Sequence, residues 1–86
     1  MKVAAIKIEL HIGEAQSLKE KRSVLRPLIE GLRSSLSVSV AEVEHQNAWQ
    51  RSGIGVAMVA RDMSELERMI DQTRRHFDRQ LRCEMV

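Results

Sequence analysis

Hydrophobic and polar residues alternate over residues 3–12 of this chain. The apolar side chains fall on every second position, and Lys7, Glu9 and His11 occupy positions between them. A period of two is typical of a β-strand that buries one of its faces. We therefore predict a first strand over this segment.

A helical pattern follows. Ser17 and Glu20 have the spacing of a capping box, in which both side chains accept hydrogen bonds from free backbone N–H groups at a helix start. A single apolar stripe then runs at helical spacing, formed by Leu25, Leu28, Ile29, Leu32 and Leu36. Pro27 lies inside this helix and lacks the N–H that would bond the carbonyl of Ser23, so we expect a kink near residues 23–27.

Strand-like alternation resumes at Val38 and Val40, but Val43 is out of register by one residue. A β-bulge at residues 41–42 would keep all three valines on one face of the sheet. Because a bulge discourages unwanted pairing, we expect this second strand to lie at a sheet edge.

The second half of the chain repeats the order of a strand followed by a helix. A polar loop over residues 45–50 leads to a third strand over 51–60, which is apolar on both sides and so is expected at the centre of its sheet. Ser64 and Glu67 match a second capping box. The buried stripe of the following helix is predicted to contain Leu66, Ile70, Thr73, Phe77 and Leu81, with Met69 beside it. Residues 81–86 form either a short fourth strand or a continuation of this helix.

The order β-α-β-β-α-β predicts one ferredoxin-like α+β domain over residues 1–86. Two right-handed crossovers give a four-stranded antiparallel sheet with both helices on one face. Strands one and three are then central, and strand two lies at an edge.

Composition narrows the class of protein. The chain of 86 residues carries a formal charge of +2, and its only large aromatic side chains are Trp49 and Phe77. Small, aromatic-poor cores often gain stability by burying a face against another copy, so we expect a homodimer. The single Cys83 and the absence of a long apolar run favour a cytoplasmic protein with no membrane segment.

Several short motifs resemble one known family. SLKEKR at 17–22, VSVAEV at 38–43, HQ at 45–46 and WQR at 49–51 are similar to the YlxP-like family of small bacterial proteins, a domain of unknown function. The resemblance covers nearly the whole chain and implies a ferredoxin-like fold. It also implies gene neighbours that act in transcription elongation, translation initiation and ribosome maturation. No activity is established for the family, so no catalytic residue is implied.

The start of the first helix is a candidate anion site. Lys19, Lys21 and Arg22 lie where the helix dipole disfavours cations. A bound anion such as an RNA phosphate would explain their position. The alternative is that Glu20 offsets them and that all three point into solvent.

The loop between the second and third strands is the other candidate contact. The residues that we expect to contact RNA or a partner are His45, Gln46, Trp49, Gln50 and Arg51. Trp49 can stack on a base or fill a partner's pocket. It can instead fold back over its own sheet edge, so the sequence leaves open whether it is core, interface or exposed.

The open face of the predicted sheet has no aromatic side chain on which RNA bases could stack. Its small apolar residues instead favour face-to-face dimerisation. The histidines lie in separate elements, and the only local His/carboxylate cluster is Glu42, Glu44 and His45. We therefore expect no catalytic residue, metal or cofactor.

The leading hypothesis is a non-catalytic module that binds RNA or a ribosome-associated protein through the helix start and the loop. The alternative is a regulatory domain in which two sheets dimerise and bind a small ligand between them.

Overall fold

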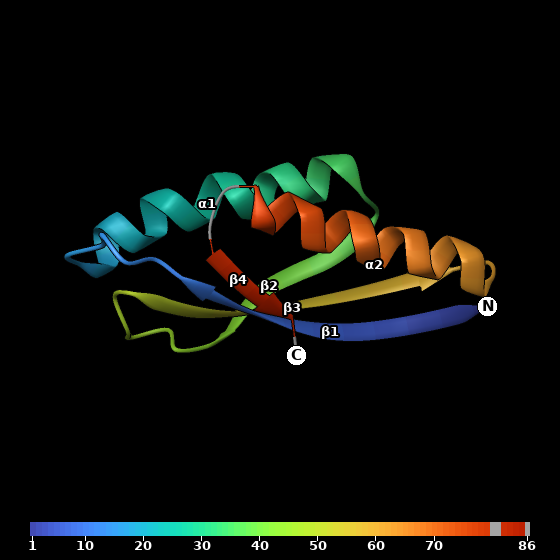
Figure 1. Ribbon diagram of the computed structural model, residues 1–86, viewed down its shortest axis with the longest axis horizontal. Helices are drawn as coiled ribbons and strands as arrows, with labels where there is room; N and C mark the ends of the chain where they lie inside the picture. The colour runs from blue at the N-terminus through green and yellow to red at the C-terminus, as the bar shows by residue number, and fades with distance from the viewer. Residues whose placement is uncertain (80–81, 86) are drawn as a thin grey trace.

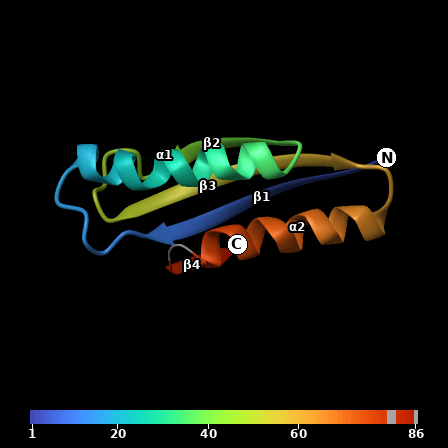
Figure 2. The same ribbon diagram turned by 90° about the horizontal axis from the view of Figure 1, so that it is seen from above.

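The computed structural model describes residues 1–79 and 82–85. Its elements are β1 (Lys2–His11), α1 (Leu18–Ser35), β2 (Val38–Glu44), β3 (Arg51–Ala60), α2 (Met63–Asp78) and β4 (Arg82–Met85). Both helices cover the same face of the sheet (Figures 1 and 2). The predicted α+β class with two helices on one face is confirmed.

The long strands form a three-stranded antiparallel sheet in the order β2-β3-β1, and the short β4 pairs with the other side of β1. β1 and β3 pair along their whole length, from Lys2 opposite Ala60 to His11 opposite Arg51. The prediction that β3 lies inside the sheet and that β2 lies at an edge is confirmed. Leu81, predicted in the α2 stripe, lies outside the described residues.

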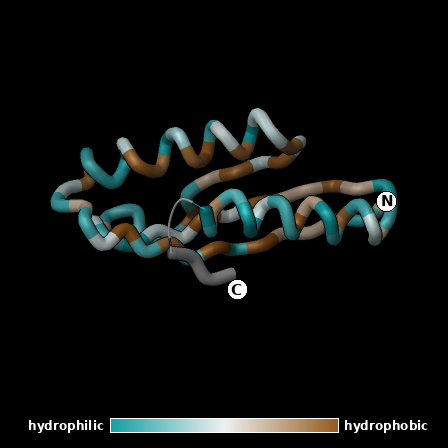
Figure 3. Tube along the Cα trace, turned by 45° about the horizontal axis from the view of Figure 1, so that its top comes forward, coloured by the Kyte–Doolittle hydropathy of each residue, from teal (hydrophilic) through white to brown (hydrophobic). Residues whose placement is uncertain are grey.

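The core lies between the sheet and the two helices. Ile8 and Leu10 of β1 pack with Ile54 and Val56 of β3 and with Phe77 of α2, all five at most 2 % exposed. Figure 3 shows apolar stretches along these strands and on the side of α1 that faces them. The opposite face of the sheet carries no helix and is called the open face below.

The bulge in β2 lies one or two residues later than predicted. Glu42 and Glu44 pair with consecutive residues of β3, so Val43 is the additional residue. Val43 is 48 % exposed and contacts the open face, so the prediction that it shares a face with Val40 is wrong. The reason is that Glu42 continues the alternation from Val40, because its carboxylate pairs with a buried lysine on the helix side.

α1 begins as predicted. Ser17 is its N-cap, and its hydroxyl accepts a hydrogen bond from the Glu20 N–H at 3.1 Å. Glu20 Oε2 accepts one in turn from the Gln16 N–H at 2.8 Å. The helix runs through Pro27 without a break.

The N-cap of α2 lies two residues before the predicted one. Its N-cap is Asp62, whose Oδ1 accepts a hydrogen bond from the Glu65 N–H at 2.8 Å, and Ser64 already lies in the first turn. The predicted capping box at Ser64 is therefore wrong. A carboxylate at the N-cap accepts this hydrogen bond and also interacts favourably with the helix dipole. A serine hydroxyl can accept the bond but carries no charge.

This assignment predicts unequal effects for two single substitutions. Asp62→Ala should lower the free energy of unfolding by about 1 kcal/mol, because an orphan N–H loses its acceptor. The matched control, Ser64→Ala, should change it by less than about 0.5 kcal/mol. Urea unfolding followed by circular dichroism measures both, and the reverse ranking would restore Ser64 as the cap.

Candidate functional site

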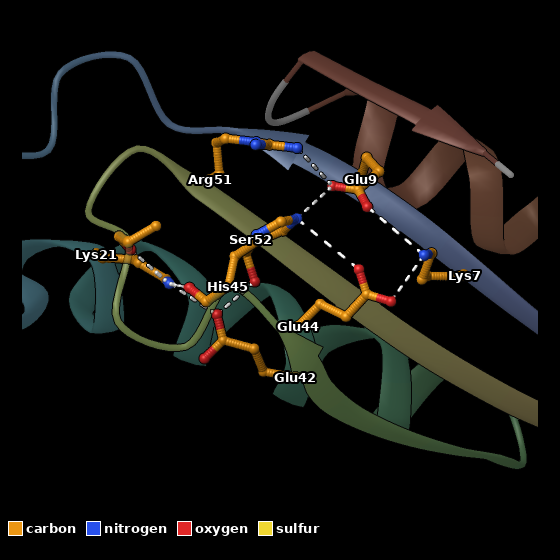
Figure 4. Close-up of polar contacts among 9 residues, drawn as sticks. Lys7, Glu9, Lys21, Glu42, Glu44, His45, Arg51 and Ser52 are labelled. Atoms are coloured by element: carbon orange, nitrogen blue, oxygen red, sulfur yellow. Dashed lines mark hydrogen bonds and ion pairs between the residues drawn. The ribbon is translucent and has the colours of Figure 1, made fainter.

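The side chain of Lys21 is buried beneath the β2–β3 loop, with 1 % of its surface exposed. Its Nζ donates hydrogen bonds to the carbonyl oxygens of His45 at 2.6 Å and Ala48 at 2.7 Å. It also forms an ion pair with Glu42 Oε2 at 2.8 Å (Figure 4). An ammonium group has three N–H donors, so these three oxygens satisfy it fully.

The burial of Lys21 corrects its predicted role. An ammonium that is covered by protein and neutralised by Glu42 cannot contact RNA or another external anion, and it does not point into solvent either. The sequence contained a signal for this outcome: Lys21 precedes Leu25 by four residues, at the start of the stripe that α1 buries.

Glu42 extends the contact to the central strand. The hydroxyl of Ser52, which is fully buried, donates a hydrogen bond to Glu42 Oε2 at 2.6 Å. One carboxylate of β2 thus joins α1 to β3. Burying an ion pair costs desolvation energy. Removing one partner then strongly lowers the stability of the fold, because the other charge is left unpaired.

The loop itself is further restrained by its backbone. His45 has a φ of 60°, in the left-handed region, and its carbonyl accepts a hydrogen bond from the Ala48 N–H at 3.0 Å. At the other end of the loop the Gln50 carbonyl accepts from the Ile12 N–H at 2.9 Å, and Gln50 Nε2 donates to the Ala15 carbonyl at 3.3 Å. The left-handed conformation costs a non-glycine residue energy, so the surrounding bonds must hold it.

The loop side chains predicted to make contacts are accessible. Trp49 is 50 % exposed, so it is not buried in the core of its own subunit. Gln46, Asn47, Gln50 and Arg51 are exposed as well. The loop therefore presents one large aromatic ring among polar side chains on a restrained backbone.

The structure also brings the two predicted contact regions together. Because the Lys21 ammonium bonds loop carbonyls, the first turns of α1 lie against the loop. Lys19 and Arg22 are exposed there, and neither has an ion-pair partner among the residues that the structure describes. Two unpaired cations thus remain on the helix turns against which the loop packs, in place of the three that were predicted. Lys19, two residues from Lys21, lies on the side of the helix turned away from the loop.

A network of charged side chains lies at the loop end of the open face (Figure 4). Lys7 Nζ is 2.8 Å from Glu44 Oε1 and 3.8 Å from Glu9 Oε1. His45 Nε2 is 3.5 Å from Glu9 Oε2 and 3.8 Å from Glu44 Oε2, and Arg51 Nη2 is 3.9 Å from Glu9 Oε2. The hydrogen bond from Lys7 lowers the pKa of Glu44 below its ordinary value, and the same bond raises the pKa of Lys7. The pair therefore stays charged around neutral pH.

This network replaces the His/carboxylate cluster expected from the sequence. Glu9, Glu44 and His45 place ligand atoms within 4.8 Å of one another, whereas Glu42 points to the helix side. Glu9 Oε2 is buried and has no hydrogen-bond partner among the described residues. Lys7 and Arg51 already face the two carboxylates, so the arrangement is best described as an ion-pair network.

Two glycines of β3 make room for the side chains that follow the bulge. A Cβ on Gly53 would lie 2.8 Å from the Cβ of Glu44, and one on Gly55 would lie 3.0 Å from Val43 Cγ1. Without them, Glu44 could not lie across β3 toward Lys7 on β1. This requirement gives a physical reason for glycine in the middle of a central strand.

A family model described as a protein of unknown function, DUF503, matches residues 3–86. The chain belongs to the DUF503 family. It is also 33 % identical over 70 residues to the uncharacterized protein YlxP of Bacillus subtilis (strain 168), a match that covers 81 % of this chain and 76 % of the relative. The predicted YlxP-like resemblance is thus confirmed. Neither described helix of this DUF503 chain is long and apolar enough to cross a membrane.

The DUF503 chain should depend strongly on Lys21 for stability. Lys21→Met should lower the free energy of unfolding by about 3 kcal/mol, the lower end of the range for a buried pair, because it leaves the partly exposed Glu42 carboxylate and two loop carbonyls without their donor. Lys19→Met, the matched control on the exposed side of the same turn, should change it by less than about 0.5 kcal/mol.

Urea unfolding measures these differences. The double variant Lys21→Met/Glu42→Leu should recover part of the loss, because it removes both charges together. Equal stability of the Lys21→Met and Lys19→Met variants would contradict the structural role of Lys21.

Proposed function

We propose that this DUF503 protein is a non-catalytic cytoplasmic module that binds RNA or a ribosome-associated partner, with RNA as the ligand that its exposed residues fit best. The observation that carries the proposal is the half-exposed Trp49, on a restrained loop that packs against the helix turns carrying the unpaired cations Lys19 and Arg22. We classify the fold as ferredoxin-like, with β4 as the fourth strand of the sheet.

The chemistry of the exposed residues supports a single-stranded ligand. Bases that are not paired in a helix can stack on an aromatic ring, and such stacking contributes about 1–3 kcal/mol per base. Gln46 carries an amide group that can bond base edges, while Lys19, Arg22 and Arg51 can meet phosphates. Lys21 is not in this set, and His45 is half-buried in the charged network.

The buried lysine supports the same proposal indirectly. Ordering a flexible loop on binding costs conformational entropy, and a loop already held by hydrogen bonds avoids part of that cost. The bonds of Lys21 to the loop carbonyls therefore preorganise the backbone on which Trp49 is carried.

The non-catalytic part of the proposal rests on how the reactive groups are used. Within residues 1–79, the carboxylates nearest to His45 face Lys7 and Arg51, so their charges are already balanced. His76, which is also half-buried, has its Nε2 2.7 Å from the carbonyl oxygen of Leu28.

RNA binding is tested by fluorescence anisotropy with a labelled twelve-nucleotide oligouridylate. Trp49→Ala should weaken binding by at least about fivefold, the lower limit expected for one lost stacking contact. Lys19→Ala/Arg22→Ala should weaken it further and reduce its dependence on salt concentration.

Arg68→Ala, which removes an exposed cation from α2, is the control and should leave the affinity unchanged. The proposal fails if wild-type protein does not bind the oligonucleotide, or if Trp49→Ala binds as tightly as wild type.

A second candidate function is favoured by the open face. Val3, Val43 and Val59 are 63 %, 48 % and 57 % exposed there, which is unusual for one face of a small protein. β1 and β3 have ten residues each and β2 has seven. At about 4.8 Å per strand and about 3.3 Å per residue, two such faces would bury roughly 850 Å² in total. That area lies below the range of stable interfaces, so a dimer of this kind should be weak. A small ligand bound between the two sheets would strengthen it.

Sedimentation velocity tests the dimer. The wild-type sedimentation coefficient should rise with protein concentration, and Val59→Asp should abolish the rise by placing a charge in the interface. Val24→Asp, at a partly exposed position on α1, should leave the rise unchanged. A concentration-independent monomer would exclude dimerisation through the open face.

A further inference from the structure

The outer edge of β2 and the neighbouring side of α1 form a groove. Three arginines of α1 line it, namely Arg22, Arg26 and Arg33, and Val40 and Ala41 form part of its floor. β2 is the edge strand of the sheet, so no further strand lies beyond it among the described residues. The groove is therefore bordered on one side by the backbone of an unpaired strand edge.

The hydrogen-bond pattern shows which backbone groups face outward. The Ile12 N–H donates a hydrogen bond to the Gln50 carbonyl, and this pair continues the β1–β3 register. Because hydrogen-bonded pairs alternate along an antiparallel ladder, the even-numbered residues of β3 point their N–H and C=O groups toward β1. Val40 and Glu42 lie opposite even-numbered residues of β3, so their own N–H and C=O groups point away from the sheet. The hydrogen bond from Arg33 Nη2 to the Val40 carbonyl, at 2.7 Å, agrees with this outward orientation of the Val40 backbone.

A further strand can pair along this edge if it displaces the side chain of Arg33, which bonds the carbonyl of Val40, a residue that is 5 % exposed. The N–H groups of Val40 and Glu42 are two residues apart and have no acceptor within the sheet. An extended peptide can pair with such an edge through its main chain, and its side chains then decide specificity.

The charges of the groove select the kind of peptide. Arg22 and Arg26 are exposed and have no ion-pair partner among the described residues. Glu42 is neutralised by Lys21, and Glu30 is bonded to Arg33 at 3.2 Å. The groove therefore carries unbalanced positive charge, which complements acidic side chains.

The spacing of the arginines, like their charge, fits an added peptide strand. Arg22 and Arg26 are one helical turn apart, about 6 Å along α1. Side chains on one face of an extended peptide repeat about every 6.8 Å. Alternate acidic residues of an added strand can therefore each meet one arginine.

The same charges argue against a second copy at this edge. An antiparallel β2–β2 pair related by a two-fold axis would bring the arginines of both copies into one groove, and their repulsion would oppose the association. We propose that the β2 edge binds an extended acidic peptide segment as an added strand, with alternate carboxylates on Arg22 and Arg26. This inference does not depend on RNA binding.

An acetylated octapeptide of alternating glutamate and valine is the probe. Titrated into ¹⁵N-labelled protein, it should shift the amide signals of Val40 and Glu42 and slow their hydrogen exchange. Arg26→Glu should weaken its affinity about tenfold by replacing an attraction with a repulsion. Arg68→Glu makes the same charge change on an exposed position of α2 and should leave the affinity unchanged.

A second peptide of the same sequence, with alternate backbone nitrogens methylated, keeps the charges but cannot form the ladder. It should not protect the two amides. The proposal is overturned if the first peptide leaves Val40 and Glu42 unaffected at millimolar concentration, or if the methylated peptide binds equally well.

Two other results would assign the groove to another occupant and overturn the proposal. In one, the oligouridylate and not the peptide shifts these amides. In the other, the amides become protected as the protein concentration rises without peptide. Loss of oligouridylate binding in Trp49→Ala with peptide binding intact would separate the two sites.

Discussion

The ammonium group of Lys21 connects three parts of the molecule that are distant in sequence. It joins the first turns of α1 to Glu42 on β2 and to the carbonyls of the following loop, and Ser52 on β3 completes the contact. Because the charge is buried, each of these oxygens has to stay in place to satisfy it. The position of the loop, and with it the exposure of Trp49, depends on this one side chain.

Glu42 and Val43 show how the same requirement shapes the sheet. Glu42 has to face the helices to meet the lysine, while Glu44 has to face the opposite way to meet Lys7. On a regular strand, residues two positions apart share a face, so a bulge between Glu42 and Glu44 is needed. The two ion pairs therefore lie on opposite faces of the sheet at the same end of the molecule. One holds the loop from beneath, and the other belongs to a network that includes His45 at the start of the loop.

The three surfaces considered as binding regions differ in their physical character. The loop offers an aromatic ring and amides beside free cations, the open face offers small apolar side chains, and the β2 edge offers backbone N–H groups beneath arginines. These chemistries suit different ligands. The proposed loop site and the proposed groove share Arg22, whereas the open face lies on the other side of the sheet.

The sequence by itself determined the α+β class, the strand and helix order and the burial of most apolar positions, because period-two and helical patterns depend only on local geometry and on which face is covered. It also placed Ser17 correctly as a cap, since capping involves neighbours within one turn. Only the tertiary structure decided that Lys21 is buried, that the bulge falls at Val43, and that Glu9 joins Glu44 and His45. Each of these depends on a partner tens of residues away, and a charged side chain carries no local mark of whether it will meet solvent or an opposite charge.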